Sequence, residues 1–267
     1  MEQISFRGGA TFDELLSVVR QLREPHSGCP WDREQTHFSL IGDLIEESYE
    51  VIDAIESEGI RNLIEELGDL LLQVCHHVVI AEEDQEFLAK DVFAGIINKL
   101  IRRHPHVFSS EALMSSAEVL QQWERIKQEE RNQLHSTDTP FSGLPRAMPA
   151  LTYAQKTQVR AASLGLDWET VTGPFKKIEK ESKELKEASS VENREAEMGD
   201  LLFSVVNVAR GIGIDAEGAL RAATQRFQSR TEGLVADARD KNIDLLSASP
   251  LVKHRLWDAA KDLENMN

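Results

Sequence analysis

Two groups of acidic residues in this chain have the spacing expected of carboxylate ligands to a metal ion. Glu46, Glu47 and Glu50 fall within an arc of about 100° on a predicted helix, so their side chains share one side. Glu66 and Asp69 share one side of the next predicted helix. If these helices pack antiparallel, four or five carboxylates converge, and a cation is needed to relieve their mutual repulsion. Oxygen ligands of this kind suit Mg²⁺ or Mn²⁺.

The acidic pattern occurs twice in the 267-residue chain. Glu-Leu-Gly-Asp-Leu-Leu at residues 66–71 recurs as Glu-Met-Gly-Asp-Leu-Leu at residues 197–202. Each copy has an acidic helix and an Asp/Trp pair before it and a Trp-x-x-x-Lys after it. Four markers in the same order indicate two homologous helical domains. We expect them at residues 1–135 and 150–267, joined by a linker at 136–149 that is rich in Pro and Ser.

A solvated acidic face is the simplest alternative to a metal site. The apolar stripe of the first acidic helix lies mostly opposite Glu46 and Glu50, as a solvated face requires. Two features favour the metal site. The Glu-x-x-Asp pair lies at the edge of a broadly apolar helix, and Gly68 follows its Glu at a mid-helix position where Gly costs about 1 kcal/mol relative to Ala. Because Gly199 repeats this cost, we expect a close helix approach beside the acids.

Cationic and aromatic side chains supply candidates for binding a phosphorylated substrate. Arg102 and Arg103 end a predicted helix before Pro105, and Lys127 lies on the next one. The arginines could simply offset the helix dipole, but guanidinium and ammonium groups also bind phosphate oxygens. Trp side chains could belong to the core or stack on a base. The candidate substrate-binding residues are Trp31, Trp123, Lys156, Trp168, Arg226, Arg230, Trp257 and Lys261.

Helices must position all these residues, because no stretch alternates with a period of two for long enough to predict a strand. A capping box at residues 11–14 predicts a first helix that ends before Pro25, and a second capping signal lies at residues 115–118. Apolar periodicity predicts further helices at residues 40–55, 63–81, 88–103, 119–134, 151–164, 174–188, 194–211, 216–241 and 256–263. The fold class is therefore all-α.

The charge balance limits the class of partner. The chain has 46 acidic and 30 basic residues and a formal net charge of −16. A field of that sign repels phosphate polymers and anionic lipids, which argues against a nucleic-acid binder and a membrane binder. The most apolar run, at residues 70–81, is too short to span a bilayer, and residues 1–13 carry no secretory signal. We therefore expect a cytoplasmic protein.

The sequence resembles the MazG family of all-α nucleoside triphosphate pyrophosphohydrolases in its long, two-domain form. The resemblance rests on both acidic motifs, on Gly-Cys-Pro-Trp-Asp at residues 28–32, on Arg-Arg-His-Pro-His at residues 102–106 and on Gly-Leu-Asp-Trp at residues 165–168. It implies two tandem helical bundles, a homodimer, and hydrolysis of nucleoside triphosphates between the α and β phosphates. The products would be a nucleoside monophosphate and pyrophosphate.

The resemblance also implies a ligand set, and the chemistry of the implied reaction suggests which nearby residues are catalytic. Mg²⁺ would be held by Glu47, Glu50, Glu66 and Asp69 in the first half and by Glu181, Glu184, Glu197 and Asp200 in the second. The catalytic residues would be Glu46, Arg102, Arg103 and Lys127. Glu46 would orient or deprotonate water, and the cations would stabilise the pyrophosphate leaving group. The second half departs from the first, because Lys180 stands where the first half has Glu46.

Two other classes of function compete with this interpretation. A di-metal carboxylate oxidoreductase of the ferritin-like type also uses Glu pairs on helices, but it normally needs Glu-x-x-His ligands, and none of the acidic motifs provides one. A non-catalytic helical scaffold that binds a partner protein is the second alternative. It predicts no metal binding and tolerance of the substitution Glu66→Gln.

Overall fold

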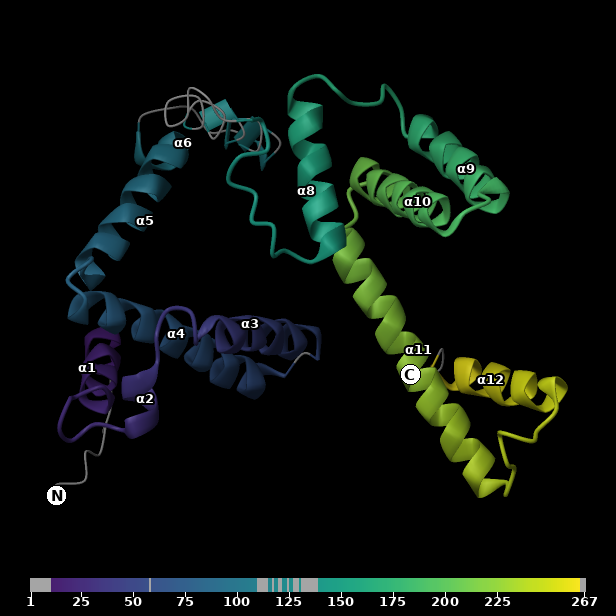
Figure 1. Cartoon of the computed structure of the whole chain (residues 1–267), viewed down its shortest axis with the longest axis horizontal. Coiled ribbons are helices and arrows are strands. Elements are labelled where there is room, and N and C mark those ends of the chain that lie inside the picture. Colours follow the sequence, from purple (N-terminus) through teal and green to yellow (C-terminus); the bar gives the residue numbers. More distant parts are fainter. Residues whose placement is uncertain are drawn as a thin grey trace. The chain divides into compact units, whose positions relative to one another are not determined.

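The computed structural model describes residues 11–57, 59–109, 115, 116, 118, 119, 122, 123, 125, 126, 130 and 139–264, except for the side chains of 262–264. Within these residues every regular element is a helix, which confirms the all-α fold class (Figure 1). None of the described helices is long and apolar enough to cross a membrane. The chain divides into two compact units, Met1–Leu134 and His135–Asn267. The expected domain boundaries and linker stay a prediction.

Unit 1 begins with the helix that the sequence predicts most directly. Its helices are α1 (Phe12–Leu22), α2 (Pro30–Glu34), α3 (Ile41–Glu56), α4 (Ile60–Glu83), α5 (Ala89–Arg103) and α6 (Pro105–Phe108). Thr11 caps α1: its hydroxyl accepts a hydrogen bond from the Glu14 amide, and the Glu14 carboxylate accepts one from the Thr11 amide at 2.7 Å. The five-residue α2 is not predicted by periodicity, since it is too short to show any.

The core of unit 1 lies between α1 and the C-terminal half of α4. Leu16 and Val19 of α1 pack there against Cys75, Val78 and Val79 of α4. The N-terminal half of α4 runs antiparallel to α3 (Figure 1). Helix α4 therefore packs against two neighbours, as its broad apolar arc predicts. Several apolar side chains of its N-terminal half nevertheless remain exposed: Ile60, Ile64, Leu67, Leu71 and Val74.

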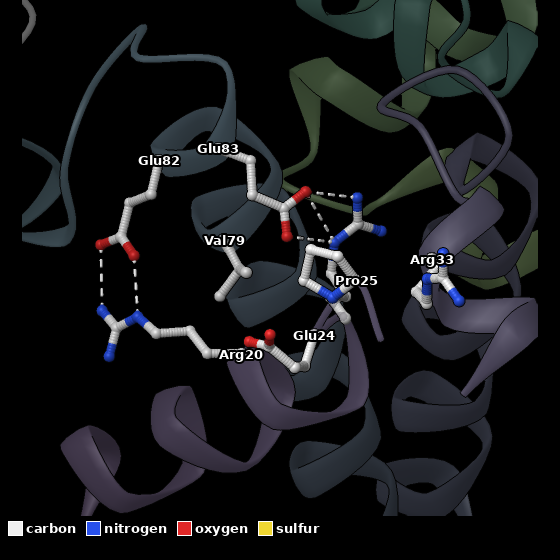
Figure 2. Close-up of a pocket in the computed structure, with 8 residues that line it drawn as sticks. Arg20, Glu24, Pro25, Arg33, Val79, Glu82 and Glu83 are labelled. Atoms are coloured by element: carbon white, nitrogen blue, oxygen red, sulfur yellow. Dashed lines mark hydrogen bonds and ion pairs between the residues drawn. The ribbon is translucent and has the colours of Figure 1, made fainter. Parts of the chain in front are cut away.

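Ion pairs fasten the end of α1 to the end of α4. Arg20 Nε lies 2.9 Å from Glu82 Oε2, and Arg23 Nη2 lies 2.7 Å from Glu83 Oε2. Figure 2 shows the Arg20–Glu82 pair as two parallel contacts. The buried Arg23 also donates to the backbone oxygens of Asp32 and Gln35. The end of α1 is thereby joined to both α2 and α4.

A tight turn connects α1 to α2, and only glycine fits in it at position 28. A Cβ atom on Gly28 would lie 2.3 Å from the Leu22 carbonyl oxygen, which no side chain can tolerate. The turn brings Asp32 against α4, where its Oδ1 lies 3.0 Å from Nε2 of His76. Both residues are buried. The Gly-Cys-Pro-Trp-Asp segment is thus a docking element that fixes α2 on α4.

Unit 2 consists of five described helices. These are α8 (Ala150–Ser163), α9 (Thr172–Glu187), α10 (Val191–Gly211), α11 (Ala216–Asp240) and α12 (Pro250–Glu264). Helices α9 and α10 form an antiparallel pair, as α3 and α4 do in unit 1 (Figure 1). Gln155 of α8 holds the connection between α10 and α11: it donates to the Ile214 oxygen at 2.9 Å and accepts from the Ala216 amide at 3.0 Å.

The predicted linker is in part attached to unit 2. Residues 139–149 form turns, and the Arg160 side chain of α8 donates to the backbone oxygens of Pro140 at 3.1 Å and Ser142 at 2.5 Å. At the other end of α8, Gly165 has a φ of +82°, in the left-handed region that glycine adopts most readily. This confirms Gly165 as the residue that ends the helix.

Candidate metal centres

Four of the predicted metal ligands meet where α3 packs against α4. Ligand oxygens of Glu47, Glu66 and Asp69 all lie within 4.8 Å of one another. The carboxyl group of Glu50 forms a hydrogen bond with that of Glu47. We call Glu47, Glu50, Glu66 and Asp69 the N cluster. Glu46 is exposed and is not part of the group of facing oxygens.

The carboxyl groups of the N cluster repel one another, and the pKa values of two of them are raised. Burial, the hydrogen bond with Glu50 and the charges of Asp69, Glu50 and Glu66 raise the pKa of Glu47 to about 7. Burial and the neighbouring carboxylates also raise the pKa of Glu66. A bound cation would relieve this repulsion by stabilising the ionised carboxylates. The donor set and its charge therefore fit a divalent metal ion.

The second acidic cluster lies between α9 and α10. Ligand oxygens of Glu181, Glu184 and Glu197 lie within 4.8 Å of one another. Glu181 is only 1% exposed, and Oε2 of Glu197 is buried with no hydrogen-bond partner among the described residues. Burial, followed by the nearby carboxyl groups of Glu184, Glu181 and Asp200, raises the pKa of Glu197. We call Glu181, Glu184, Glu197 and Asp200 the C cluster, which also fits a cation.

Two lysines distinguish the C cluster from the N cluster. Lys177 Nζ contacts Glu181 Oε1, while Lys180 Nζ lies 2.6 Å from Glu184 and 3.6 Å from Glu181. Lys177 is the main cause of a lowered pKa for Glu181, whereas the pKa of Glu47 in unit 1 is raised. Sequence reasoning missed Lys177. Its signal was the spacing of four residues to Glu181, which places the two side chains on the same helix face.

The predicted catalytic arginines bind a different carboxylate. Arg102 Nε lies 2.7 Å from Glu130 Oε1, and Arg103 Nη2 lies 2.5 Å from Glu130 Oε2. These arginines lower the pKa of Glu130 to about 2, Arg103 contributing most. In the part of the chain that the structure describes, no contact joins either arginine to the N cluster. Lys127 lies outside the described residues, and the catalytic role of all three cations stays a prediction.

The candidate tryptophans lie in different surroundings. Trp31 is exposed on α2, and Trp168 is half exposed with its ring against Gly173, where a Cβ atom would lie 2.2 Å from the ring. The ring centroid of Trp123 lies 6.2 Å from that of His104, and that of Trp257 lies 5.4 Å from that of Phe227. Stacking on a base is therefore open sterically to Trp31 and Trp168, and it stays a prediction.

The remaining cationic candidates lie on unit 2. Lys156, Arg226 and Lys261 are exposed, and Arg230 is half-buried. Arg226 and Arg230 belong to α11, and Lys261 belongs to α12, which packs against it. Their role in substrate binding also stays a prediction.

The expected close approach of helices at the two mid-helix glycines is wrong within this chain. Apart from its chain neighbours and the backbone of its own helix, a Cβ atom built on Gly68 or on Gly199 would meet no atom of the described residues within 4 Å. Both positions are exposed. The sequence pattern placed Gly68 and Gly199 correctly within the acidic helices. It could not show that the side of the helix where each Cβ atom would lie is open.

One pocket of unit 1 lies away from the N cluster. It encloses about 560 Å³ beside α1, α2 and the end of α4, and Figure 2 shows its lining. Its charged lining residues are Arg20, Arg23, Glu24, Arg33, Glu82 and Glu83. The ion pairs that fasten α1 to α4 account for four of these six side chains. None of the N-cluster residues lines this pocket, so it is not the candidate metal centre.

Comparison with known proteins identifies relatives along nearly the whole chain. A "Nucleoside triphosphate pyrophosphohydrolase" of Escherichia coli K12 is 40% identical over 258 residues, which cover 94% of this chain and 97% of that protein. A "Nucleoside triphosphate pyrophosphohydrolase/pyrophosphatase MazG" of Thermotoga maritima is 42% identical over 254 residues, covering 95% and 96%. A solved "mazG-related protein from Thermotoga maritima" covers 43% of this chain at 27% identity, with a TM-score of 0.38.

A model of one protein family matches the part of unit 1 that contains the N cluster. It is described as the MazG nucleotide pyrophosphohydrolase domain and covers residues 35–108. That range includes α3, α4 and α5, and therefore both helices that carry the facing carboxylates. Together with the two long relatives, this match confirms the resemblance inferred from the motifs: the chain belongs to the MazG nucleotide pyrophosphohydrolase family.

Proposed function

We propose that the chain hydrolyses nucleoside triphosphates between the α and β phosphates and releases a nucleoside monophosphate and pyrophosphate. The observation that carries this proposal is the meeting of Glu47, Glu66 and Asp69 oxygens within 4.8 Å, from two different helices. A solvated acidic face would spread its carboxylates apart. The names of the Escherichia coli and Thermotoga maritima relatives support the same activity.

The two clusters would hold Mg²⁺ or Mn²⁺. Once bound, the metal would neutralise the triphosphate and polarise the phosphoryl group that water attacks. The chain's own carboxylates fix where that cation is held, because α3 and α4 present them from both sides. Glu46 precedes the first ligand and is exposed, so it is free to orient or deprotonate water at the edge of the N cluster.

The arginines at the end of α5 are suited to phosphate oxygens. Arg102 and Arg103 both reach one carboxylate, that of Glu130, and a phosphate group offers them a similar pair of oxygens. We propose that Arg102, Arg103 and Lys127 stabilise the pyrophosphate leaving group. Substrate phosphates would then take over the contacts that Glu130 makes in the free protein.

The exposed apolar side chains of α3 and α4 support a homodimer. Ile41, Ile45 and Tyr49 of α3 are exposed, as are several apolar residues of the N-terminal half of α4. Such a surface is costly in water and is typical of a protein interface. We propose that a second copy of the chain covers it. The alternative of a non-catalytic scaffold would use the same surface for another protein.

A product assay in ¹⁸O-labelled water tests the proposed reaction. The full chain is incubated with a panel of nucleoside triphosphates and Mg²⁺, and the products are identified by mass spectrometry. Attack at the α phosphorus releases pyrophosphate and places the label in the monophosphate. Orthophosphate as the first product, or label in pyrophosphate, would contradict the proposal.

Paired variants assign the activity to each cluster. Glu66→Gln with Asp69→Asn removes two charges from the N cluster, and Glu197→Gln with Asp200→Asn does the same to the C cluster. At least one of these pairs should reduce kcat/KM by about 100-fold or more. Glu65→Gln is the matched control, since this residue precedes Glu66, is exposed and does not belong to the group of facing oxygens. Full activity in both paired variants would contradict the assignment of the reaction to the two clusters, whereas a wild-type chain that hydrolyses no nucleoside triphosphate would support the scaffold.

A further inference from the structure

The two acidic clusters differ in charge at one equivalent position. The repeat places Glu47 of α3 in register with Glu181 of α9, because each is the first member of a Glu-x-x-Glu pair. The residue before it is Glu46 in unit 1 and Lys180 in unit 2. A carboxylate in one cluster is thus replaced by an ammonium group in the other.

The ammonium group of Lys180 contacts the C cluster directly. Its Nζ lies 2.6 Å from Glu184 and 3.6 Å from Glu181, so it bridges the two members of the Glu-x-x-Glu pair. Many lysine–glutamate pairs on a helix are solvated and contribute little. This one differs because Glu181 is only 1% exposed, although Lys180 itself is 56% exposed. Lys177 contacts this buried carboxylate as well, and Lys180 is the cation that reaches both Glu181 and Glu184.

A charge count compares how strongly the two clusters attract divalent ions. The N cluster and Glu46 present five carboxylates, a charge of −5 when all are ionised. The C cluster with Lys180 and Lys177, which both contact it, presents four carboxylates and two ammonium groups, a charge of −2. Two divalent ions in the N cluster leave a net charge of −1, and one divalent ion in the C cluster leaves a net charge of zero. A second divalent ion in the C cluster would leave a net positive charge.

The next turn of each helix extends the contrast. Four residues before the first ligand, α3 has Asp43 and α9 has Lys177. Lys177 contacts Glu181 from that position. The surroundings of the C cluster are therefore positive at two positions where those of the N cluster are negative.

We propose that the ammonium group of Lys180 takes the place of one divalent ion, so that the C cluster binds one ion where the N cluster binds two. The inference rests on the proposed function only in taking both clusters to be metal centres. Lys180 precedes Glu181 in the chain and contacts the carboxylates of Glu181 and Glu184. It would act on the metal ion only through these carboxylates, so it is a positioning residue.

Counting Mn²⁺ bound to the full chain tests this stoichiometry without an activity assay. Free Mn²⁺ is measured by electron paramagnetic resonance during a titration with the metal alone. We expect three ions per chain for the wild type and four for Lys180→Glu, which restores the residue of unit 1. Lys183→Glu is the matched control: it makes the same change on α9 at a side chain that is 74% exposed and pairs with Glu187. It should still bind three ions.

Variants of the N cluster locate the additional ion. Glu66→Gln with Asp69→Asn should leave one ion per chain, and adding Lys180→Glu should raise the count to two. In the same background, Lys180→Gln should bind its single ion several-fold more tightly, because the competing ammonium group is gone. This variant keeps the test decisive if Lys180→Glu fails to fold, which circular dichroism would show.

The failure of this inference differs from the failure of the proposed function. A count that stays at three in a folded Lys180→Glu, or unchanged affinity in Lys180→Gln, would overturn the role of Lys180. Equal counts at the two clusters in the wild type would do the same. If neither cluster binds Mn²⁺ at millimolar concentration, the metal centres themselves are refuted, and the proposed function fails with them.

Discussion

The Asp32 carboxylate and the His76 ring form a buried contact, with 3.0 Å between Asp32 Oδ1 and His76 Nε2. Asp32 ends the Gly-Cys-Pro-Trp-Asp motif, and His76 lies on α4, two turns after the candidate ligand Asp69. The contact therefore fixes the segment that carries Trp31 to the helix that carries two residues of the N cluster. A motif and a candidate metal centre that are separate in the sequence are parts of one framework.

Unit 2 makes a corresponding contact with different residues. Asp167, which precedes Trp168, forms an ion pair with Arg210 at the end of α10. In this pair, Nη1 of Arg210 lies 3.1 Å from Oδ2 of Asp167. Arg210 also binds Asn207 at 2.8 Å. In both units an Asp beside a Trp is thus attached to the helix of the Glu-x-x-Asp pair. The repeat preserves this attachment while the partner changes from His to Arg.

Removing the Asp32–His76 contact should destabilise unit 1. We expect Asp32→Ala to lower the free energy of unfolding by about 2–4 kcal/mol, because it leaves buried His76 without its partner. Urea unfolding followed by circular dichroism measures the change. In a double-mutant cycle with His76→Ala, the coupling energy should exceed about 1 kcal/mol. The exposed Asp53→Ala should stay within about 0.5 kcal/mol of the wild type. If the losses of unfolding free energy caused by Asp32→Ala and His76→Ala simply add in the double variant, the two side chains do not interact.

The sequence predicted the helices well where local signals act alone. The capping residues Thr11 and Ser115 form their hydrogen bonds with Glu14 and Glu118, and Gly165 ends α8. These signals depend on a few neighbouring residues, so a single sequence carries them. The convergence of carboxylates on α3 and α4 followed from helix geometry and from a short connection that forces antiparallel packing.

The sequence could not predict features that depend on contacts between residues of different helices. The free side of Gly68 has the same local pattern whether it faces a neighbour or open space. The contacts of Arg102 with Glu130 join residues 28 positions apart on different helices, and no periodicity links them. Similarly, the spacing of Lys177 and Glu181 allows a contact but does not show that Glu181 is buried. Burial is a property of the packed structure.

Neutralising Glu47 should stabilise the metal-free protein at alkaline pH. The pKa of Glu47 in the folded state is about 7, above its ordinary value of 4.5, so the folded state binds the proton more tightly. Its contribution to stability therefore falls as the pH rises from 4.5 through 7. We expect Glu47→Gln to raise the Tm by a few degrees at pH 8 without metal, and to have little effect at pH 5.

Adding metal should reverse the order of the Tm values of the wild type and Glu47→Gln. Mg²⁺ at pH 8 should raise the Tm of the wild type more than that of Glu47→Gln, because the variant lacks one of the proposed ligands. Differential scanning fluorimetry measures both effects. Glu46→Gln removes a charge from the adjacent exposed position and should leave the metal-free Tm nearly unchanged. If Glu47→Gln lowers the metal-free Tm at pH 8, its carboxylate is not under repulsive strain.

The two cysteines should differ sharply in reactivity. Cys75 lies fully buried in the core of unit 1, and burial raises the pKa of its thiol to about 11. Cys29 is only half-buried. Because the thiolate is the reactive form, a thiol reagent at pH 8 should modify one cysteine per native chain and two in urea. Cys29→Ser should reduce the native count to zero. Rapid modification of Cys75 in the folded protein would show that the α1–α4 core opens readily.

The Glu130 contacts should stabilise unit 1 in a pH-dependent way. Arg103 and Arg102 lower the pKa of Glu130 to about 2 from 4.5, so the ionised carboxylate favours the folded state. This contribution is fully present above pH 4.5 and is lost as the pH falls through about 2. We expect Glu130→Gln to lower the free energy of unfolding by about 1–3 kcal/mol at pH 7. Urea unfolding at pH 7 and at steps down to pH 3 should show the free energies of unfolding of the wild type and the variant converging.

The exposed Glu65→Gln serves as the charge-matched control. A difference that stays constant over this range would mean that packing, and not the charge of Glu130, holds Arg102 and Arg103.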